Sequence, residues 1–148
     1  MKKFVFSLKA VKGYKEKLLE NIKMEYAAIL HDISKQEKRI AEMEETERLV
    51  NMELNDKNSK GIAPHELMNY SRYIKVLQFN IKQEYEKLRK LHETEEKKRD
   101  ELIDMKKETA SFEMLEEKRL GEYNYLARKE QEIFIEEFVS NKKYAAAP

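Results

Sequence analysis

The sequence predicts an all-α protein in which two long helices form an antiparallel coiled-coil hairpin, with the second helix overhanging the first. Charged residues make up 40% of the 148 residues, glycine and proline number only three and two, and apolar residues recur with a heptad period. So large a charged fraction does not suit a compact core, and so few turn-forming residues do not suit a sheet of short strands. Long helices remain.

The first helix is expected over residues 4–55. Steps of four and three residues in alternation, starting at Leu19, trace one continuous seam, which is typical of a coiled coil. The seam consists of Leu19, Ile22, Tyr26, Ile29, Ile33, Gln36, Ile40, Met43, Glu47, Val50 and Leu54.

A turn is expected over residues 56–63. Pro64 suits the first turn of a new helix, because its φ is fixed and it lacks an N–H group. The residues before it favour turns and helix ends, namely Asn55, Asp56, Asn58, Ser59 and Gly61.

The second helix is expected over residues 64–141, followed by a short C-terminal tail, so that residues 1–148 form a single hairpin. Its seam consists of Leu67, Tyr70, Ile74, Leu77, Ile81, Glu84, Leu88, Leu91, Glu95, Lys98, Leu102, Met105, Thr109 and Phe112. A short connection makes the helices antiparallel, so the position numbers of facing seam residues should add to a constant. They add to 121 for Leu54 with Leu67, Glu47 with Ile74, Ile40 with Ile81, Ile33 with Leu88, Tyr26 with Glu95 and Leu19 with Leu102.

Past about Lys118 the second helix has no expected antiparallel neighbour, yet it remains rich in apolar residues. A soluble chain rarely exposes such a surface unless it serves for docking, self-association or folding back onto the shaft. We expect a monomer when unbound. The candidate partner-binding residues at this open end are Phe4, Phe6, Leu120, Tyr123, Leu126, Phe134 and Phe138.

The turn end carries a second group of aromatic residues. Tyr73 and Phe79 flank the seam, and Met68 lies close by. The candidate partner-binding residues at this end are Tyr70, Tyr73 and Leu77. Between the two ends, the polar seam residues Glu84, Glu95 and Lys98 are expected to fix the register or to allow bending.

Catalysis is not expected, because a two-helix rod has no concave pocket, and no catalytic residue or cofactor is predicted. His31, His65 and His92 are scattered, so no metal site is predicted either. The 30 basic and 29 acidic residues are interleaved, which disfavours binding to nucleic acid and to anionic membranes. Direct membrane insertion is not expected, because a spanning helix needs about 20 apolar residues.

Three segments resemble the FliJ family, the small coiled-coil proteins of the bacterial flagellar type III export apparatus. They read FVFSLKAVKGYKEK, KGIAPHELMNYSRYIKVLQFNI and KKETASFEMLEEKRLGEYNYLARKEQEIFIEEF. The most specific spacing comprises Gly61, Ile62, Glu66, Leu67, Asn69, Tyr70 and Tyr73. Near the C-terminus, Glu136 and Glu137 precede Phe138 where the family often has paired aspartates before an aromatic residue.

The resemblance implies an antiparallel hairpin similar to the central shaft of rotary ATPases. It also implies that the open end engages the export ATPase hexamer, that the second helix near the turn contacts the export-gate membrane protein, and that the protein handles export chaperones. The resemblance further implies that the protein is cytoplasmic and peripherally associated with the inner face of the membrane at the flagellar base. The absence of cysteine suits a reducing compartment. The alternatives are a structural self-associating coiled coil, or the shaft subunit of a rotary ATPase or of a virulence-type secretion system.

Overall fold

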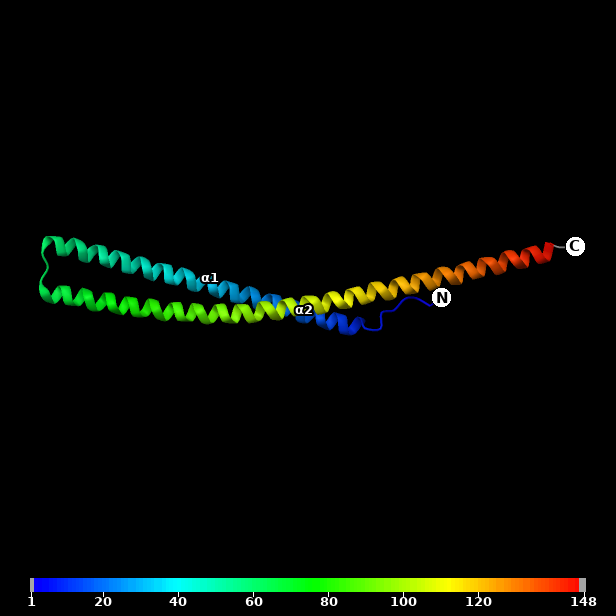
Figure 1. Cartoon of the computed structure of the whole chain (residues 1–148), viewed down its shortest axis with the longest axis horizontal. Coiled ribbons are helices and arrows are strands. Elements are labelled where there is room, and N and C mark those ends of the chain that lie inside the picture. Colours follow the sequence, from blue (N-terminus) through cyan, green and yellow to red (C-terminus); the bar gives the residue numbers. More distant parts are fainter. Residues whose placement is uncertain (1, 147–148) are drawn as a thin grey trace. The chain divides into compact units, whose positions relative to one another are not determined.

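The computed structural model describes residues 2–146 and confirms the all-α fold. Two helices account for almost all of them: α1 (Lys9–Lys60) and α2 (Pro64–Ala146), joined by a short turn (Figure 1). No strand occurs within residues 2–146. Hydrogen bonds join Tyr26 to Glu95, Gln36 to Glu84 and Glu53 to Tyr70, so the paired residue numbers rise along α1 as they fall along α2, and the helices run antiparallel.

Contacts group the described chain into two compact units, and both helices contribute to each. The turn-end unit comprises residues 21–102 and contains the connection between α1 and α2. The open-end unit comprises residues 2–20 and 103–146, and contains the start of α1 and the second half of α2.

The end of α1 differs from the expectation. We predicted a turn over residues 56–63, but α1 continues to Lys60, and of this stretch only residues 61–63 lie outside the helices. The reason is local: Gly61 has a φ of +93°, and the left-handed backbone that ends many helices is readily adopted only by glycine. Asn, Asp and Ser tolerate a last helical turn, and the Ser59 hydroxyl donates to the Asp56 carbonyl at 2.7 Å.

The start of α1 also differs, whereas the start of α2 agrees. We expected α1 to begin near Phe4, but it begins at Lys9, because the residues before it are not helical and pack along α2, where Phe6 is buried. The second helix begins at Pro64 as predicted, and its first backbone bond runs from the Leu67 N–H to the Ala63 carbonyl at 3.1 Å. It ends at Ala146 rather than near residue 141.

The predicted seam forms the core of the turn-end unit. Ile22, Ile33 and Ile40 of α1 and Ile81 and Leu102 of α2 are buried. The Tyr26 hydroxyl donates to the Glu95 carboxylate at 2.8 Å, and these two residues belong to the predicted register. Leu67 is a correction: it is 38% exposed, because the last layer of the seam opens where the chain turns.

The polar residues Glu84 and Lys98 of the seam form hydrogen bonds or ion pairs with neighbouring residues. Glu84 is 6% exposed, and its carboxylate accepts a hydrogen bond of 2.5 Å from the Gln36 amide of α1. The same amide donates to the Glu84 backbone carbonyl at 2.9 Å. Further along, the Lys98 ammonium contacts Glu25 at 2.7 Å and Glu101 at 3.0 Å. Such layers favour one register, because a slip of the seam would leave these groups without partners.

Candidate interaction surfaces

The N-terminal segment, residues 2–8, packs along α2 in the open-end unit. Phe6 is only 4% exposed, and Phe4 is half-buried with its ring centroid 5.5 Å from that of Tyr123. The Tyr123 hydroxyl donates to the Lys2 carbonyl. We predicted Phe4, Phe6 and Tyr123 as partner-binding residues; the structure places them in contacts between the N-terminal segment and α2, and their binding to a partner stays a prediction.

Arg119 of α2 holds this segment, a role that was not predicted from the sequence. Its guanidinium donates to the Ser7 hydroxyl at 2.6 Å and lies 5.7 Å from the centroid of the Phe6 ring. The signal was present: steps of four, three and four residues past Phe112 lead to Glu116, Arg119 and Tyr123. Glu116 pairs with the Lys12 ammonium at 2.5 Å, which raises the pKa of Lys12.

The part of α2 without a neighbour therefore begins after Tyr123, not after Lys118 as expected. We call residues 124–146 the overhang; an ideal helix of that length spans about 35 Å. All described side chains of residues 128–145 are exposed. Among its exposed apolar residues are the predicted Leu126, Phe134 and Phe138, at 54%, 67% and 59% exposure. Leu120 lies before the overhang and is 39% exposed.

Two apolar pairs share one face of the overhang. Phe134 with Phe138, and Ile135 with Val139, are each four residues apart, so their side chains are neighbours on the helix surface. Residues 130–141 contain four glutamates and no lysine or arginine, namely Glu130, Glu132, Glu136 and Glu137. This segment presents an apolar face with acidic flanks.

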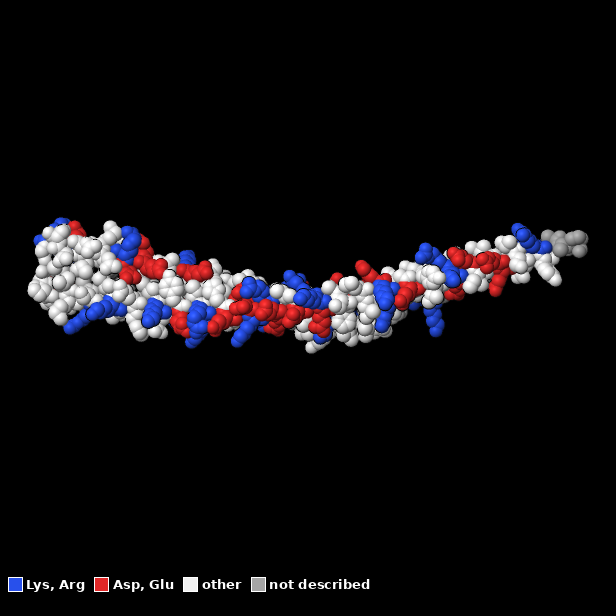
Figure 2. Space-filling model, in the orientation of Figure 1, with Lys and Arg blue, Asp and Glu red and all other residues white. Residues whose placement is uncertain are grey.

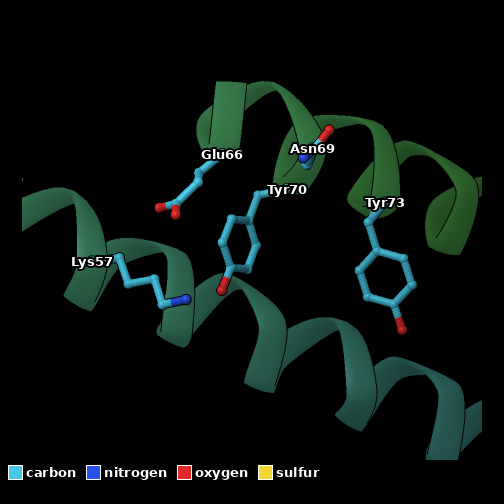
Figure 3. A pocket seen from close by; sticks show the side chains of 5 residues that line it. All are labelled: Lys57, Glu66, Asn69, Tyr70 and Tyr73. Atoms are coloured by element: carbon cyan, nitrogen blue, oxygen red, sulfur yellow. The ribbon is translucent and has the colours of Figure 1, made fainter. Parts of the chain in front are cut away.

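At the turn end, Tyr70 and Tyr73 point from α2 toward α1 beside an open cleft of about 310 Å³ (Figure 3). The cleft is lined by Lys57, Glu66, Asn69, Tyr70 and Tyr73. The Tyr70 hydroxyl donates to the Glu53 carboxylate at 2.9 Å, and the Lys57 ammonium lies 5.1 Å from the Tyr70 ring centroid. The hydrogen bond with Tyr70 raises the pKa of Lys57.

The three residues predicted at this end differ in accessibility. Tyr73 is 48% exposed, whereas Tyr70 and Leu77 are half-buried at seam positions. Phe79 and Met68, named from the sequence as flanking residues, are 61% and 55% exposed. Val76 was missed, although it is 54% exposed.

Residues 2–146 contain neither a metal-binding cluster nor a membrane-spanning helix. No group of three or more His, Asp or Glu residues is arranged to hold a metal ion. Neither helix contains a segment long and apolar enough to cross a membrane.

Comparison with known proteins gave one match. The sequence model of a family described as flagellar FliJ protein matches residues 4–140, nearly the whole chain. Comparisons with curated proteins and with solved structures found no match.

Proposed function

Since the chain belongs to the FliJ family of flagellar protein-export components, we propose that it is a non-enzymatic adaptor that docks its open end into the export ATPase hexamer. The overhang is the observation that supports this most directly. It exposes Phe134 and Phe138 on one face of an unpaired helix, and such a face gains stability when it is covered by a partner.

The N-terminal segment has a supporting part in this proposal. Phe6 is buried and Arg119 holds it, so residues 2–8 brace α2 at the base of the overhang rather than contact the ring directly. The overhang is then presented from a fixed base. Its glutamates would meet basic residues lining the ring, because unlike charges steer association.

The turn end would contact the export-gate membrane protein, with Tyr73 as the accessible residue of the predicted set. The adaptor would also handle export chaperones and lie at the inner face of the membrane at the flagellar base. Its effect on both partners would come from binding some of their conformational states more tightly than others, since a ligand shifts an equilibrium only through differential affinity.

An ATPase assay with the purified export ATPase tests the open-end contact. We expect the full chain to change hexamer assembly and turnover, and deletion of residues 124–148 to abolish this effect while the circular-dichroism spectrum remains helical. The deletion starts after Tyr123, so that the N-terminal segment keeps its contacts.

Point substitutions sharpen the test. Phe134→Ser with Phe138→Ser should weaken ring binding, whereas Phe79→Ser, an equally exposed phenylalanine at the turn end, should not. Retained binding by the double variant, or equal loss in the control, would contradict this docking mode.

The exposed overhang also supports a second candidate, a coiled coil that self-associates through residues 124–146. Sedimentation at micromolar concentration separates the two functions. A monomer leaves the overhang free for the ATPase, whereas a dimer lost on deletion of the overhang would favour self-association.

A further inference from the structure

A second heptad stripe runs along α2 in the turn-end unit, outside the seam. It consists of Met68, Arg72, Lys75, Phe79 and Lys82, again separated by four, three, four and three residues. Each member precedes a seam residue by two positions, which is about 200° around an ideal helix. The stripe therefore lies on the face of α2 opposite the seam, and we call it the outer stripe.

The outer stripe is accessible. Phe79 is 61% and Met68 55% exposed, and Val76, which adjoins Arg72 and Phe79 on the helix surface, is 54% exposed. The three basic residues are exposed as well. Apolar side chains and cations are thus interspersed over about 21 Å, the axial length of residues 68–82 in an ideal helix.

The cations of the outer stripe have no ion pair among the described residues. Within residues 2–146, no Asp or Glu lies at ion-pair distance from Arg72, Lys75 or Lys82. Other cations of the same unit do have such a carboxylate, among them Lys57, Lys60, Lys87 and Arg89. In Figure 2 the edge formed by α2 next to the turn accordingly shows Lys and Arg atoms among uncharged ones.

We infer that the outer stripe binds an acidic amphipathic helix of a partner protein. Charge complementarity carries this assignment, because three unpaired cations beside exposed apolar side chains favour an occupant that is negative at its flanks and apolar in its middle. The heptad spacing favours a helix in particular: a partner helix laid along the stripe would meet a residue at every a and d position.

An anionic membrane fits the stripe less well. Polybasic membrane contacts use clusters of about four to eight cations, whereas the stripe has three in a single row along one helix. The row is also as narrow as a helix–helix seam. The inference deepens the proposed contact between the turn end and the export-gate membrane protein. It rests on that contact only for the protein that supplies the helix, because the cations and their exposure do not depend on the partner's identity.

A designed peptide pair provides the probe. The acidic peptide has 21 residues, with leucine at heptad positions a and d and glutamate at e and g; the basic peptide has lysine at e and g instead. Fluorescence anisotropy at low salt measures the binding of each labelled peptide to the full chain. We expect the acidic peptide to bind at least about tenfold more tightly than the basic one, because three exposed ion pairs each contribute a few-fold.

Charge reversal locates the site. The triple variant Arg72→Glu, Lys75→Glu, Lys82→Glu should bind the acidic peptide about tenfold more weakly and the basic peptide more tightly. The matched control Lys97→Glu, Lys106→Glu, Lys107→Glu changes the net charge equally at exposed positions elsewhere on α2, and should stay within about twofold of the parent chain. If charge reversal reduces helicity, the triple glutamine variant is measured in its place, with the same direction expected.

Several outcomes overturn the inference: equal binding of the two peptides, equal loss in the control, or binding of vesicles rich in phosphatidylserine in preference to the acidic peptide. Pull-down of the export-gate membrane protein in detergent separates this inference from the proposed function. If the acidic peptide binds but the export-gate protein does not, the stripe is supported and the gate contact is refuted. If the export-gate protein binds equally with and without charge reversal, the gate contact is supported, and the gate protein is refuted as the source of the helix.

Discussion

Ile40→Ala tests the predicted seam most directly. Ile40 is 3% exposed on α1, and the substitution removes three carbon atoms from the seam. At about 0.8 kcal/mol for each buried CH₂ group, the lost transfer free energy is about 2.4 kcal/mol, and the residual cavity adds to it. Because a two-helix core relaxes easily around a cavity, we expect a loss of about 3 kcal/mol in the free energy of unfolding.

Urea denaturation followed by circular dichroism measures this loss, with the m-value serving to detect any change in the unfolded state. Met24→Ala is the matched control on α1, since Met24 is 70% exposed, and it should change the stability by no more than about 0.5 kcal/mol. A loss below about 1 kcal/mol for Ile40→Ala, or an equal loss for the control, would refute the seam.

A double-mutant cycle extends the test to the register. Ile40 and Ile81 face each other in the predicted register, so the two alanine substitutions should be non-additive by about 0.5 kcal/mol or more. Ile22 lies several helical turns from Ile40, and those two substitutions should add. Additivity in both cycles would mean that the register is wrong.

Three further predictions follow from single residues. Gln36, Lys87 and Arg39 lower the pKa of Glu84 below its ordinary 4.5. The ionised carboxylate therefore stabilises the fold above about pH 4.5, and this stabilisation is lost as the pH falls through the lowered pKa. Glu84→Gln should flatten that part of a curve of unfolding free energy against pH. Gly61→Ala should destabilise the chain by about 1–2 kcal/mol, because the φ of Gly61 is +93°. Gly13→Ala should stabilise it by about 0.5–1 kcal/mol, because Gly13 lies inside α1 and no atom lies within 4 Å of the new Cβ. Thermal denaturation of both variants measures these changes. Phe6→Ser should speed amide hydrogen exchange in residues 2–8, since that segment would lose its buried anchor; unchanged exchange would contradict the packing described here.

Much of the fold could be predicted from the sequence, because a coiled-coil seam is a local and repeated pattern. The heptad spacing of Ile22, Ile33 and Ile40 predicted a buried face, and Pro64 predicted the start of the second helix. Turn residues were less informative than the single glycine: Asn58 and Ser59 are compatible with both a turn and a last helical turn, and only the positive φ of Gly61 decides between them.

The candidate surfaces were predicted only in part. Counting apolar residues identified Phe134 and Phe138 as exposed, because an unpaired helix leaves nowhere to bury them. It could not separate them from Phe6, which is equally apolar but lies in a segment that folds onto α2. Nor could it show that Arg72 lacks an ion pair while Arg89 has one, because the rotamers that bring a carboxylate to a guanidinium depend on the neighbouring side chains.

The sequence by itself determined the two helices, their antiparallel pairing and the excess length of the second, since each depends on spacing along the chain. Only the tertiary structure decided where pairing stops. Residues 2–8 continue the pairing of α2 to Tyr123 without being helical, and the helical periodicity of a sequence does not reveal a segment that pairs in this way.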